Sequence, residues 1–521
     1  MARSVCISTL TLTTALTFLG ATAHAESLAE AIALAYRTNP SLVSQRAQLR
    51  ALDERYVQAK SGLRPNVTIG AVTQSTLSIK GAPTFLDDRH FTNAEASISA
   101  TQVLSSFGKT AAEISIAEAT VLAGRENLRK AEGEILLSVM ESYAAVRRDE
   151  QIVAIRTRTV SAFQSQVDQT NGRIKGGDST LTDLGQAEAQ LASSQAALAL
   201  AQAQLQASRA TYAALVGQNP GTLEPEPEIQ DDTTDLDKAF ANAEADNPSV
   251  LLAVMNEKVG RANVRSARAQ SRPTVSLSGD YVATGAQPFE RANIDSELIG
   301  RVGFSMPLLA GGYNRSLVRE AQQNHEALYS EIELARRAAL QSVSTSWNQI
   351  VVADQQMNYG ANAVRASQTS SEGARLEYRE GYRSFFEVLN EEQRLLEAQL
   401  LIVQARYSRF VGQASLLNAM GRLSAAKLVD GLQAYDPKTH FDKVKRKGWT
   451  PWEPLISVVD NVTGPRDREF KPMLTPAAAP AAMRPAAPPP PARPLGVSVP
   501  IDAEREDVVG QLIMDTMNEK P

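Results

Sequence analysis

The sequence predicts an α+β membrane protein in which one unit, built of helices and a β-hairpin, occurs twice. Many residues between Leu28 and Val67 return 208 residues later, and among them Asn39-Pro40-Ser41 recurs as Asn247-Pro248-Ser249. Farther along, the offset is 204, so that Gly177 recurs as Gly381. Long proline-free stretches and segments of alternating polar and apolar residues give each copy its helices and strands. Because this period is far longer than that of a solenoid repeat, we expect two similar halves lying side by side.

The duplication divides the chain of 521 residues into four segments. We expect a signal peptide over 1–25, the first structural repeat over 26–227, the second over 228–435, and a C-terminal extension over 436–521. Each repeat should contain a short helix, a β-hairpin, a long helix and a return helix.

The first segment has the features of a secretory signal peptide. Met1-Ala2-Arg3 precedes an apolar, Thr-rich stretch over 5–20, and Ala23-His24-Ala25 forms a small-x-small cleavage site. A membrane anchor is the alternative, and the short apolar stretch disfavours it. Cys6, the only cysteine of the chain, is removed with this segment. The mature protein is therefore expected to contain neither a disulfide nor a thiolate site.

Charge and hydropathy exclude two classes of protein. The net charge is −5, from 53 basic and 58 acidic residues dispersed along the chain, which leaves no broad basic surface for nucleic acid. Nothing after the signal peptide resembles the roughly 18 apolar residues of a membrane helix. An exported protein of this kind is either soluble or crosses an outer membrane through β-strands.

Each repeat opens with a helix that is interrupted at Asn-Pro, over 28–61 and 236–271, and that ends before Arg-Pro. The spacing of apolar residues then changes from the helical period of 3.6 to the strand period of 2. Two strands follow in each repeat, joined by a polar loop near 78–92 in the first and near 284–295 in the second. The apolar positions alternate with small polar ones; they are Val67, Ile69, Ala71, Ala96, Ile98 and Ala100 in the first copy, and Val275, Leu277, Gly279, Tyr281, Leu298, Gly300, Val302 and Phe304 in the second.

These hairpins fit membrane strands or ordinary soluble hairpins. The strands are long enough for the roughly 9 to 11 residues of a tilted membrane strand. One face is apolar with small residues, while the other is polar and carries Arg301. We favour membrane strands, because such a difference is expected when one face meets lipid and the other water.

Each hairpin is followed by two helices that should form a coiled coil. The segments 109–171 and 313–375 contain no proline, and each predicts one helix of roughly 90 Å. The return helices carry apolar residues seven apart, with many Ala and Ser at the seam. The heptad positions are Leu184, Leu191, Leu198, Leu205 and Tyr212 in the first copy, and Leu389, Leu396, Val403, Phe410 and Leu417 in the second.

The C-terminal extension has two parts. A basic patch of Lys443, Lys445, Arg446 and Lys447 stands beside Trp449 and Trp452. Residues 471–500 then contain ten of the chain's 25 prolines, among many Ala residues. This composition predicts a Pro/Ala-rich and largely disordered extension, and for the basic patch we favour a solvated tail over a binding site.

The four strands constrain the assembly. A barrel needs about eight strands, so one chain cannot close one. An open sheet in lipid would leave its edge amides unsatisfied. If the hairpins are in a membrane, several chains must pool their strands, and their long helices must continue the barrel as a tube. Such an assembly is a conduit.

These features together resemble the TolC family of trimeric outer-membrane channels for tripartite efflux and type I secretion. The resemblance covers Leu28 to about Gly421 and depends on the repeated Asn-Pro and Arg-Pro, on Met306-Pro307-Leu308-Leu309-Ala310-Gly311-Gly312, and on Gly381-Tyr382-Arg383. It implies a homotrimer, a 12-stranded barrel in the outer membrane, and a helical tunnel in the periplasm, where the C-terminal extension would also lie. It also implies a periplasmic adaptor (membrane fusion) protein and an inner-membrane ABC or RND transporter as partners. Drugs and a secreted protein both fit as cargo.

A different class of function stays open on the residues alone. A periplasmic coiled-coil adaptor or scaffold with soluble hairpins would contain the same helices and no membrane barrel. It would be extracted without detergent, whereas the channel would fractionate with the outer membrane as a heat-resistant trimer.

The resemblance also implies a gate at the periplasmic mouth. By position, the gate Tyr corresponds to Tyr378 and the gate Arg to Arg383. The usual Asp partner of this Arg aligns with Gln151, which departs from the family pattern, and Asp149 or Glu150 beside it are possible substitutes.

Two acidic rings line the mouth in that family. The first corresponds to Glu387 and the second to Asn390, so the expected ring charge is halved. Three Glu387 carboxylates around a narrow pore would favour cations and bind divalent or trivalent metal ions that plug it. Without the resemblance, Glu387 would be one more exposed helix carboxylate.

No enzyme or cofactor site is expected. Gly108-Lys109-Thr110 is similar to the end of a P-loop, but Val103 stands at the leading glycine position. His325-Glu326 begins a zincin motif in which Tyr329 replaces the second His. The mature histidines, His90, His325 and His440, have no ligand spacing, which disfavours a metal site.

Overall fold

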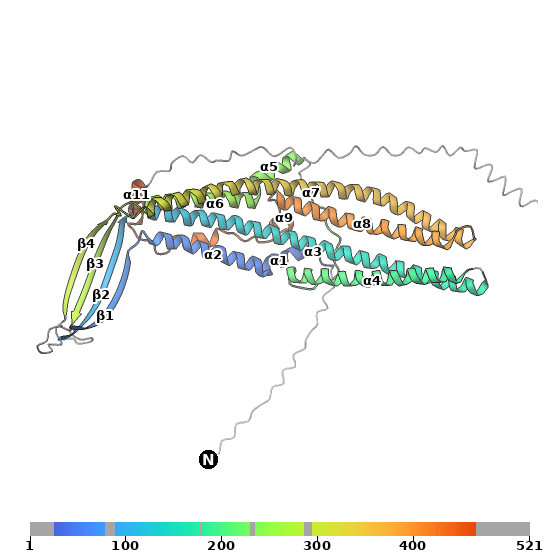
Figure 1. Cartoon of the computed structure of the whole chain (residues 1–521), viewed down its shortest axis with the longest axis horizontal. Coiled ribbons are helices and arrows are strands. Elements are labelled where there is room, and N and C mark those ends of the chain that lie inside the picture. Colours follow the sequence, from blue (N-terminus) through green and yellow to red (C-terminus); the bar gives the residue numbers. More distant parts are fainter. Residues whose placement is uncertain (1–24, 79–88, 178, 230–234, 286–293, 465–521) are drawn as a thin grey trace, which may run out of the picture. The chain divides into compact units, whose positions relative to one another are not determined.

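A computed structural model describes residues 25–78, 89–177, 179–229, 235–285 and 294–464, and all of these belong to one compact unit. The expected signal peptide, the two hairpin loops and the Pro-rich part of the extension therefore lie outside the described residues. Figure 1 shows the helices of the two copies running side by side, with the four strands together at one end of them.

Each copy contains the predicted elements in the predicted order. The first consists of α1 (Leu28–Thr38), α2 (Pro40–Ser61), β1 (Asn66–Ser78), β2 (Arg89–Ser105), α3 (Lys109–Gly176) and α4 (Leu181–Val216). The second consists of α5 (Leu236–Asp246), α6 (Pro248–Ala269), β3 (Thr274–Gly285), β4 (Asp295–Ser305), α7 (Tyr313–Arg379) and α8 (Phe385–Ala419). Three short helices follow: α9 (Ala425–Leu428), α10 (Thr439–Val444) and α11 (Glu453–Thr463).

The repeated Asn-Pro ties the beginning of each half to its end. Asn39 caps α2 by accepting a hydrogen bond from Ser41 N (2.9 Å), and Pro40 occupies the first helical turn, where no donor is needed. The Asn39 amide also donates to the carbonyl of Leu215, at the end of α4 (3.0 Å). Asn247 donates in the same way to Ala419 O at the end of α8 (2.7 Å). The residue thus has two roles, which explains its presence in both copies.

Each hairpin is followed by one continuous long helix, as the sequence predicted. α3 has 68 residues and α7 has 67, which gives each a length of roughly 100 Å. α4 packs along the end of α3, and α8 along the end of α7, while α6 bridges the two halves by packing on α3. Within the described residues, no helix is both long enough and apolar enough to cross a membrane.

The strands form one antiparallel sheet in the order β1-β2-β3-β4. The register places Ile69 opposite Ile98, Ile98 opposite Tyr281, and Tyr281 opposite Leu298, so all four strands contribute to one apolar face. In the single chain this face is open, with Ile69 82% and Leu298 81% exposed. The opposite face is polar and carries an ion pair between Arg301 and Asp280 (3.0 Å). The alternation predicted from the sequence is confirmed.

The C-terminal extension begins with residues that pack on the protein, whereas the sequence favoured a solvated tail there. α10 packs on α2, where His440 Nδ1 lies 2.9 Å from the buried Asp53 carboxylate, and the ring of Phe441 lies 5.0 Å from that of Tyr56. α11 packs on β2 and α3. We call residues 436–464 the C-terminal strap. Its partners are distant in sequence, with Asp53 387 and Ser106 354 residues away, so no local pattern could predict that it docks.

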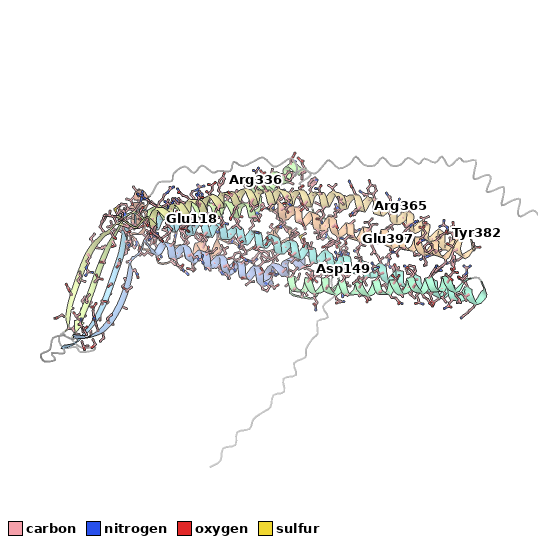
Figure 2. All side chains as sticks on the ribbon, in the orientation of Figure 1. Glu118, Asp149, Arg336, Arg365, Tyr382 and Glu397 are labelled. Atoms are coloured by element: carbon pink, nitrogen blue, oxygen red, sulfur yellow. The ribbon has the colours of Figure 1, made fainter. Side chains whose placement is uncertain are left out.

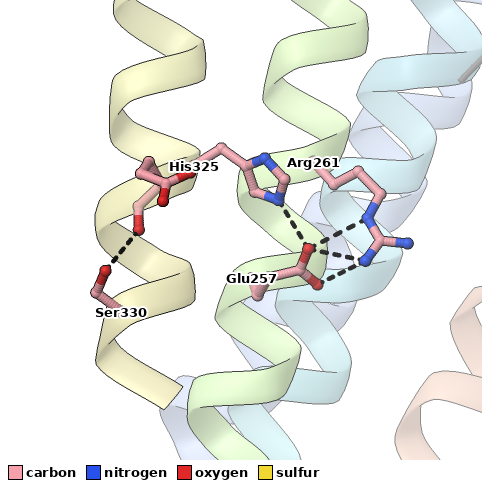
Figure 3. Close-up of polar contacts among 5 residues, drawn as sticks. Glu257, Arg261, His325 and Ser330 are labelled. Atoms are coloured by element: carbon pink, nitrogen blue, oxygen red, sulfur yellow. Dashed lines mark hydrogen bonds and ion pairs between the residues drawn. The ribbon is translucent and has the colours of Figure 1, made fainter. Parts of the chain in front are cut away.

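A buried polar cluster joins α6 to α7 (Figure 3). Glu257 accepts hydrogen bonds from Arg261 Nη2 (2.8 Å) and lies 2.7 Å from His325 Nε2. Burial raises the pKa of the Glu257 carboxyl, but the hydrogen bonds with His325 and Arg261 outweigh it and hold this pKa below its usual range. The His325-Glu326 pair is therefore part of helix packing. Among the described residues, no three metal-binding side chains come together.

Replacing Glu257 by Gln should destabilise the protein at neutral pH by about 1 to 3 kcal/mol, because the buried His325 ring and the more exposed Arg261 guanidinium lose a charged acceptor. Because the pKa of Glu257 is lower in the folded protein than in the unfolded chain, its ionised carboxylate stabilises the folded state at pH values above the unfolded-state pKa. This contribution is lost as the pH falls through the folded-state pKa. The variant should therefore lose less stability on acidification than the parent. Denaturant unfolding from neutral to acidic pH checks this, with the exposed Glu320→Gln on the same pair of helices as control. Equal acid sensitivity of parent and Glu257→Gln would contradict it.

Candidate functional site

The two helical hairpins end in turns of the same construction, at the end of the helices that lies away from the sheet (Figure 1). In each turn a glycine takes the left-handed conformation, Gly177 with φ 85° and Gly381 with φ 83°. A hydroxyl residue then caps the return helix: Thr180 accepts from Asp183 N (3.2 Å), and Ser384 accepts from Glu387 N (3.4 Å). The sequence offset of 204 relates the members of each pair.

Tyr378 lies at the contact between the two hairpins. Its ring centre is 5.7 Å from that of the buried Phe385, and the Arg173 guanidinium of α3 lies 4.6 Å from its centre. Arg173 also donates a hydrogen bond to the Tyr378 carbonyl (3.2 Å). Around them is an apolar cluster of Val167, Leu184, Ala187, Leu191 and Leu389. Tyr378 thus connects α7 to α3, as well as to α8.

Arg383 crosses its own turn. Its Nε lies 2.5 Å from a carboxylate oxygen of Glu377 and 4.0 Å from one of Glu387. The side chain is 38% exposed, so water screens both pairs. Within one chain, Arg383 therefore bridges the end of α7 and the start of α8.

Glu387 and Asn390 share one surface of α8. Both are exposed, three residues apart, while Phe385 and Val388 are buried on the other side of the helix. The predicted ring residues thus point away from the packed surface, as a residue that lines a pore must.

The structure does not bring Gln151 to this site. Gln151 precedes the last residue of α3, Gly176, by 25 positions, or about 38 Å of helix. Its neighbours are also engaged elsewhere: Asp149 accepts from Arg148 Nε (2.7 Å) and Ser208 Oγ (2.5 Å), and Glu150 pairs with Arg209 (2.9 Å). Figure 2 shows Asp149 well back along the helices from Tyr382, which marks the tip.

Asp183 is a further acidic residue at the tip, which the sequence analysis did not single out. It stands in the first turn of α4, at the tip, and is the repeat counterpart of Glu387. A hydrogen bond from the Thr180 backbone N–H holds the pKa of this carboxyl below its usual range, so it is ionised at neutral pH. Two signals could have found it: the offset of 204, and the capping box from Thr180 to Asp183.

The similarity to a P-loop has a structural explanation. The backbone N–H groups of Gly108 and Ala111, which would face a phosphate, donate to the carboxylate of Asp460 in the C-terminal strap (3.2 and 3.1 Å). This turn is therefore a capped helix start.

Comparison with known proteins agrees with this architecture. The family model described as "Outer membrane efflux protein" matches residues 31–218 and 239–422. The two matches begin 208 residues apart (239 − 31) and end 204 residues apart (422 − 218), which are the offsets of the duplication. The chain is 30% identical over 433 residues to the outer membrane efflux protein BepC of Brucella suis biovar 1, covering 82% of this chain and 92% of BepC. It is 26% identical over 430 residues to the outer membrane protein TolC of Escherichia coli K12, covering 78% and 84%.

Solved structures share the fold. The outer membrane protein VceC of Vibrio cholerae is similar with a TM-score of 0.65 and 20% identity, over 76% of this chain and 96% of VceC. The CmeC outer membrane channel of Campylobacter jejuni has a TM-score of 0.69 and 14% identity, over 81% and 90%. The alternative of a coiled-coil adaptor without a membrane barrel is therefore set aside. The chain belongs to the outer membrane efflux protein family, and it is an exit duct of the outer membrane built from a duplicated unit of strands and helices.

Proposed function

We propose that three copies of this chain form one closed conduit, gated at its helical tips and joined there to a periplasmic adaptor protein and an inner-membrane ABC or RND transporter. The observation that carries the proposal is the four-stranded sheet, which has one open apolar face and two unpaired edges, β1 and β4.

Closure follows from the edges. An unpaired strand edge in lipid leaves backbone N–H and C=O groups without partners, at several kcal/mol each. Pairing β4 of one copy with β1 of the next removes every edge once the ring closes. Three copies supply twelve strands (3 × 4), above the minimum of about eight. The apolar face then meets lipid, and the face with Arg301 and Asp280 meets the water-filled interior.

At the opposite end, the proposed gate consists of Tyr378 and Arg383, with Asp183 as the acidic partner in place of Gln151. Asp183 and Arg383 stand at equivalent turns of two hairpins, and their side chains are of opposite charge type. In the assembly each second hairpin has a first hairpin on either side, one of its own chain and one of the next. An ion pair across that second contact would hold neighbouring chains together at the tip.

The assembled state is tested by reconstitution. Purified protein should run as a heat-resistant trimer and give discrete single-channel conductance in planar bilayers. A detergent-free monomer without conductance would refute the proposal. Cross-linking from the tip residue Ser384 should capture a periplasmic adaptor, and capture only from the sheet end would contradict the proposed orientation.

Glu387→Ala should weaken block of the channel by trivalent cations. Three carboxylates at one level of a narrow pore concentrate cations, whereas Asn390 adds no charge at the next level. Titration of the conductance with a trivalent metal complex checks this. The control is Glu397→Ala, an exposed carboxylate farther along α8. If Glu387→Ala is blocked at the same concentration as the parent, the ring assignment fails.

A further inference from the structure

Helix α11 has two different faces. On the inner face, Glu453, Ile456 and Asp460 are buried. Glu453 pairs with Lys60 (3.1 Å) and Arg64 (3.2 Å) of the first repeat, and Asp460 binds the start of α3. These contacts fix the orientation of the helix on the protein.

The outer face is apolar and exposed. Its residues follow helical spacing and continue the two exposed tryptophans that precede the helix. We call this set the apolar stripe: Trp449, Trp452, Leu455, Val458, Val459 and Val462, with Leu455 70% and Val462 81% exposed. An exposed row of large apolar side chains on a helix indicates a surface that something covers.

The stripe lies at the base of the sheet. Thr463 at the end of α11 lies within hydrogen-bond distance of Ser105 at the end of β2 (3.3 Å, Oγ1 to Oγ). Arg272, just before β3, donates to the Thr463 carbonyl (2.5 Å). Ser105 is opposite Val275, which is opposite Phe304, and Phe304 is 68% exposed on the apolar face. Figure 1 shows α11 at this junction of strands and helices. The stripe therefore begins where the apolar face of the sheet ends.

A basic cluster accompanies the stripe. Lys443, Lys445, Arg446 and Lys447 precede the two tryptophans. Two of them, Lys445 and Arg446, line an open cavity with Lys60 of α2 and the carboxylate of Glu453, and Tyr56 and Trp449 form its aromatic wall. Three cations beside one carboxylate leave an excess of positive charge next to two aromatic rings, which suits a phosphodiester headgroup.

We propose that α11 is an interfacial helix that lies in the periplasmic leaflet of the outer membrane, with anionic phospholipid as its occupant. The sheet is the membrane part of an outer-membrane channel, so its helix-side end is at the periplasmic surface of the bilayer. Tryptophan, lysine and arginine gather at that level of membrane proteins, because their rings and stems enter the interface while their polar groups stay wet. With 11 residues, α11 is about 16 Å long, too short to span the bilayer and suited to lie along it. The basic cluster matches the negative charge of anionic headgroups.

The competing occupant is a neighbouring copy of the chain, which would also cover the stripe. The two differ in what surrounds Leu455 and Val462: lipid in the first case, protein in the second. A probe at these positions can therefore decide.

The experiment uses the full-length trimer in vesicles of phosphatidylethanolamine and phosphatidylglycerol. Because Cys6 is the chain's only cysteine and belongs to the predicted signal peptide, single-cysteine variants need no other change in the mature chain. Leu455→Cys and Val462→Cys are labelled with an environment-sensitive fluorophore. The matched control is Asn461→Cys, which is exposed on the same helix but lies off the stripe. Single-channel conductance of each labelled sample shows that the channel has assembled.

We expect spin-labelled lipid to quench the probes at 455 and 462 much more than the probe at 461, with labels near the headgroup quenching more than labels deep in the chains. Iodide in the water should quench 461 most. Replacing phosphatidylglycerol by phosphatidylcholine should reduce lipid quenching, and Lys445→Gln with Arg446→Gln should abolish this dependence on anionic lipid. Strong iodide quenching at 455 and 462 would overturn the proposal in favour of a free surface. Protection from both quenchers would overturn it in favour of a neighbouring copy.

Discussion

Substituting Tyr378 by Phe together with Arg383 by Ser is expected to open the resting channel and to raise its conductance several-fold. Phe keeps the ring packing on Phe385 but removes the hydroxyl, and Ser removes the guanidinium that the proposed gate pairs with Asp183 of the next chain. An exposed ion pair is worth up to about 1 kcal/mol. Three copies together thus give about 3 kcal/mol, which shifts the ratio of closed to open channels about a hundredfold.

This effect should be specific to the tip. Arg394→Ser removes the same charge farther along α8, where Arg394 pairs with Glu391 and is 68% exposed, and it should leave conductance unchanged. Because the tip residues are largely on the surface, the thermal stability of the double variant should stay close to that of the parent. Single-channel recording of both variants checks the prediction, and equal conductance of the double variant and the parent would remove Tyr378 and Arg383 from the gate.

Asp460→Ala is expected to give the largest loss of stability, about 2 to 4 kcal/mol. The carboxylate is 1% exposed and accepts hydrogen bonds from Ser106 N (2.6 Å), Gly108 N (3.2 Å) and Ala111 N (3.1 Å), and from Ser106 Oγ. The capping residue Gly108 has no side chain, and the local contribution is the Ser106 hydroxyl, which accepts from Thr110 N (2.8 Å). The substitution leaves several buried donors without a partner at the positive end of a helix of about 100 Å.

Denaturant unfolding and hydrogen exchange at residues 106–111 measure this loss. Asp442→Ala is the matched control, since Asp442 is in the same strap, is 56% exposed and pairs only locally with Lys445. Asp460→Asn should be intermediate, because the amide keeps one acceptor and loses the charge. If Asp460→Ala costs no more than Asp442→Ala, the cap does not stabilise the junction.

Most of the fold could be predicted because its signals are local or repeated. The alternation of apolar and polar residues along the strands indicates directly which side chains share a face of the sheet. The absence of proline over 109–171 and 313–375 predicts the long helices to within five residues of their ends. The repeated Asn-Pro predicts the start of α2 and α6. Its second bond, to the end of the return helix, needs the tertiary structure.

The site was predicted only in part. Gly381 marks the turn at which Tyr378, Arg383 and Glu387 were expected, and the structure places all three there. The sequence reasoning looked for the acidic partner of Arg383 in α3, which runs for 68 residues without an internal landmark, so the position matched there can be wrong by several helical turns. Gly177 and Thr180 mark the equivalent turn of the first half, and counting from them leads to Asp183.

The strap could not be predicted at all. Glu453 and Asp460 are ordinary acidic residues in a short amphipathic segment until their partners near residues 60 and 108 are known. Burial of a carboxylate depends on those partners, and sequence separation of several hundred residues hides them.

The hydrogen bond from Ser106 N to Asp460 joins residues 354 positions apart, so it can form only late in the biogenesis of the chain. Synthesis and export proceed from the amino terminus, so the N–H groups of Gly108 and Ala111 at the start of α3 lack their carboxylate partner until the chain has been translated past residue 460. A polypeptide that stops earlier carries both complete repeats and every strand, yet leaves that helix start open beside them. The joint between the sheet and the long helices is therefore completed late in synthesis, by a residue that follows both repeats.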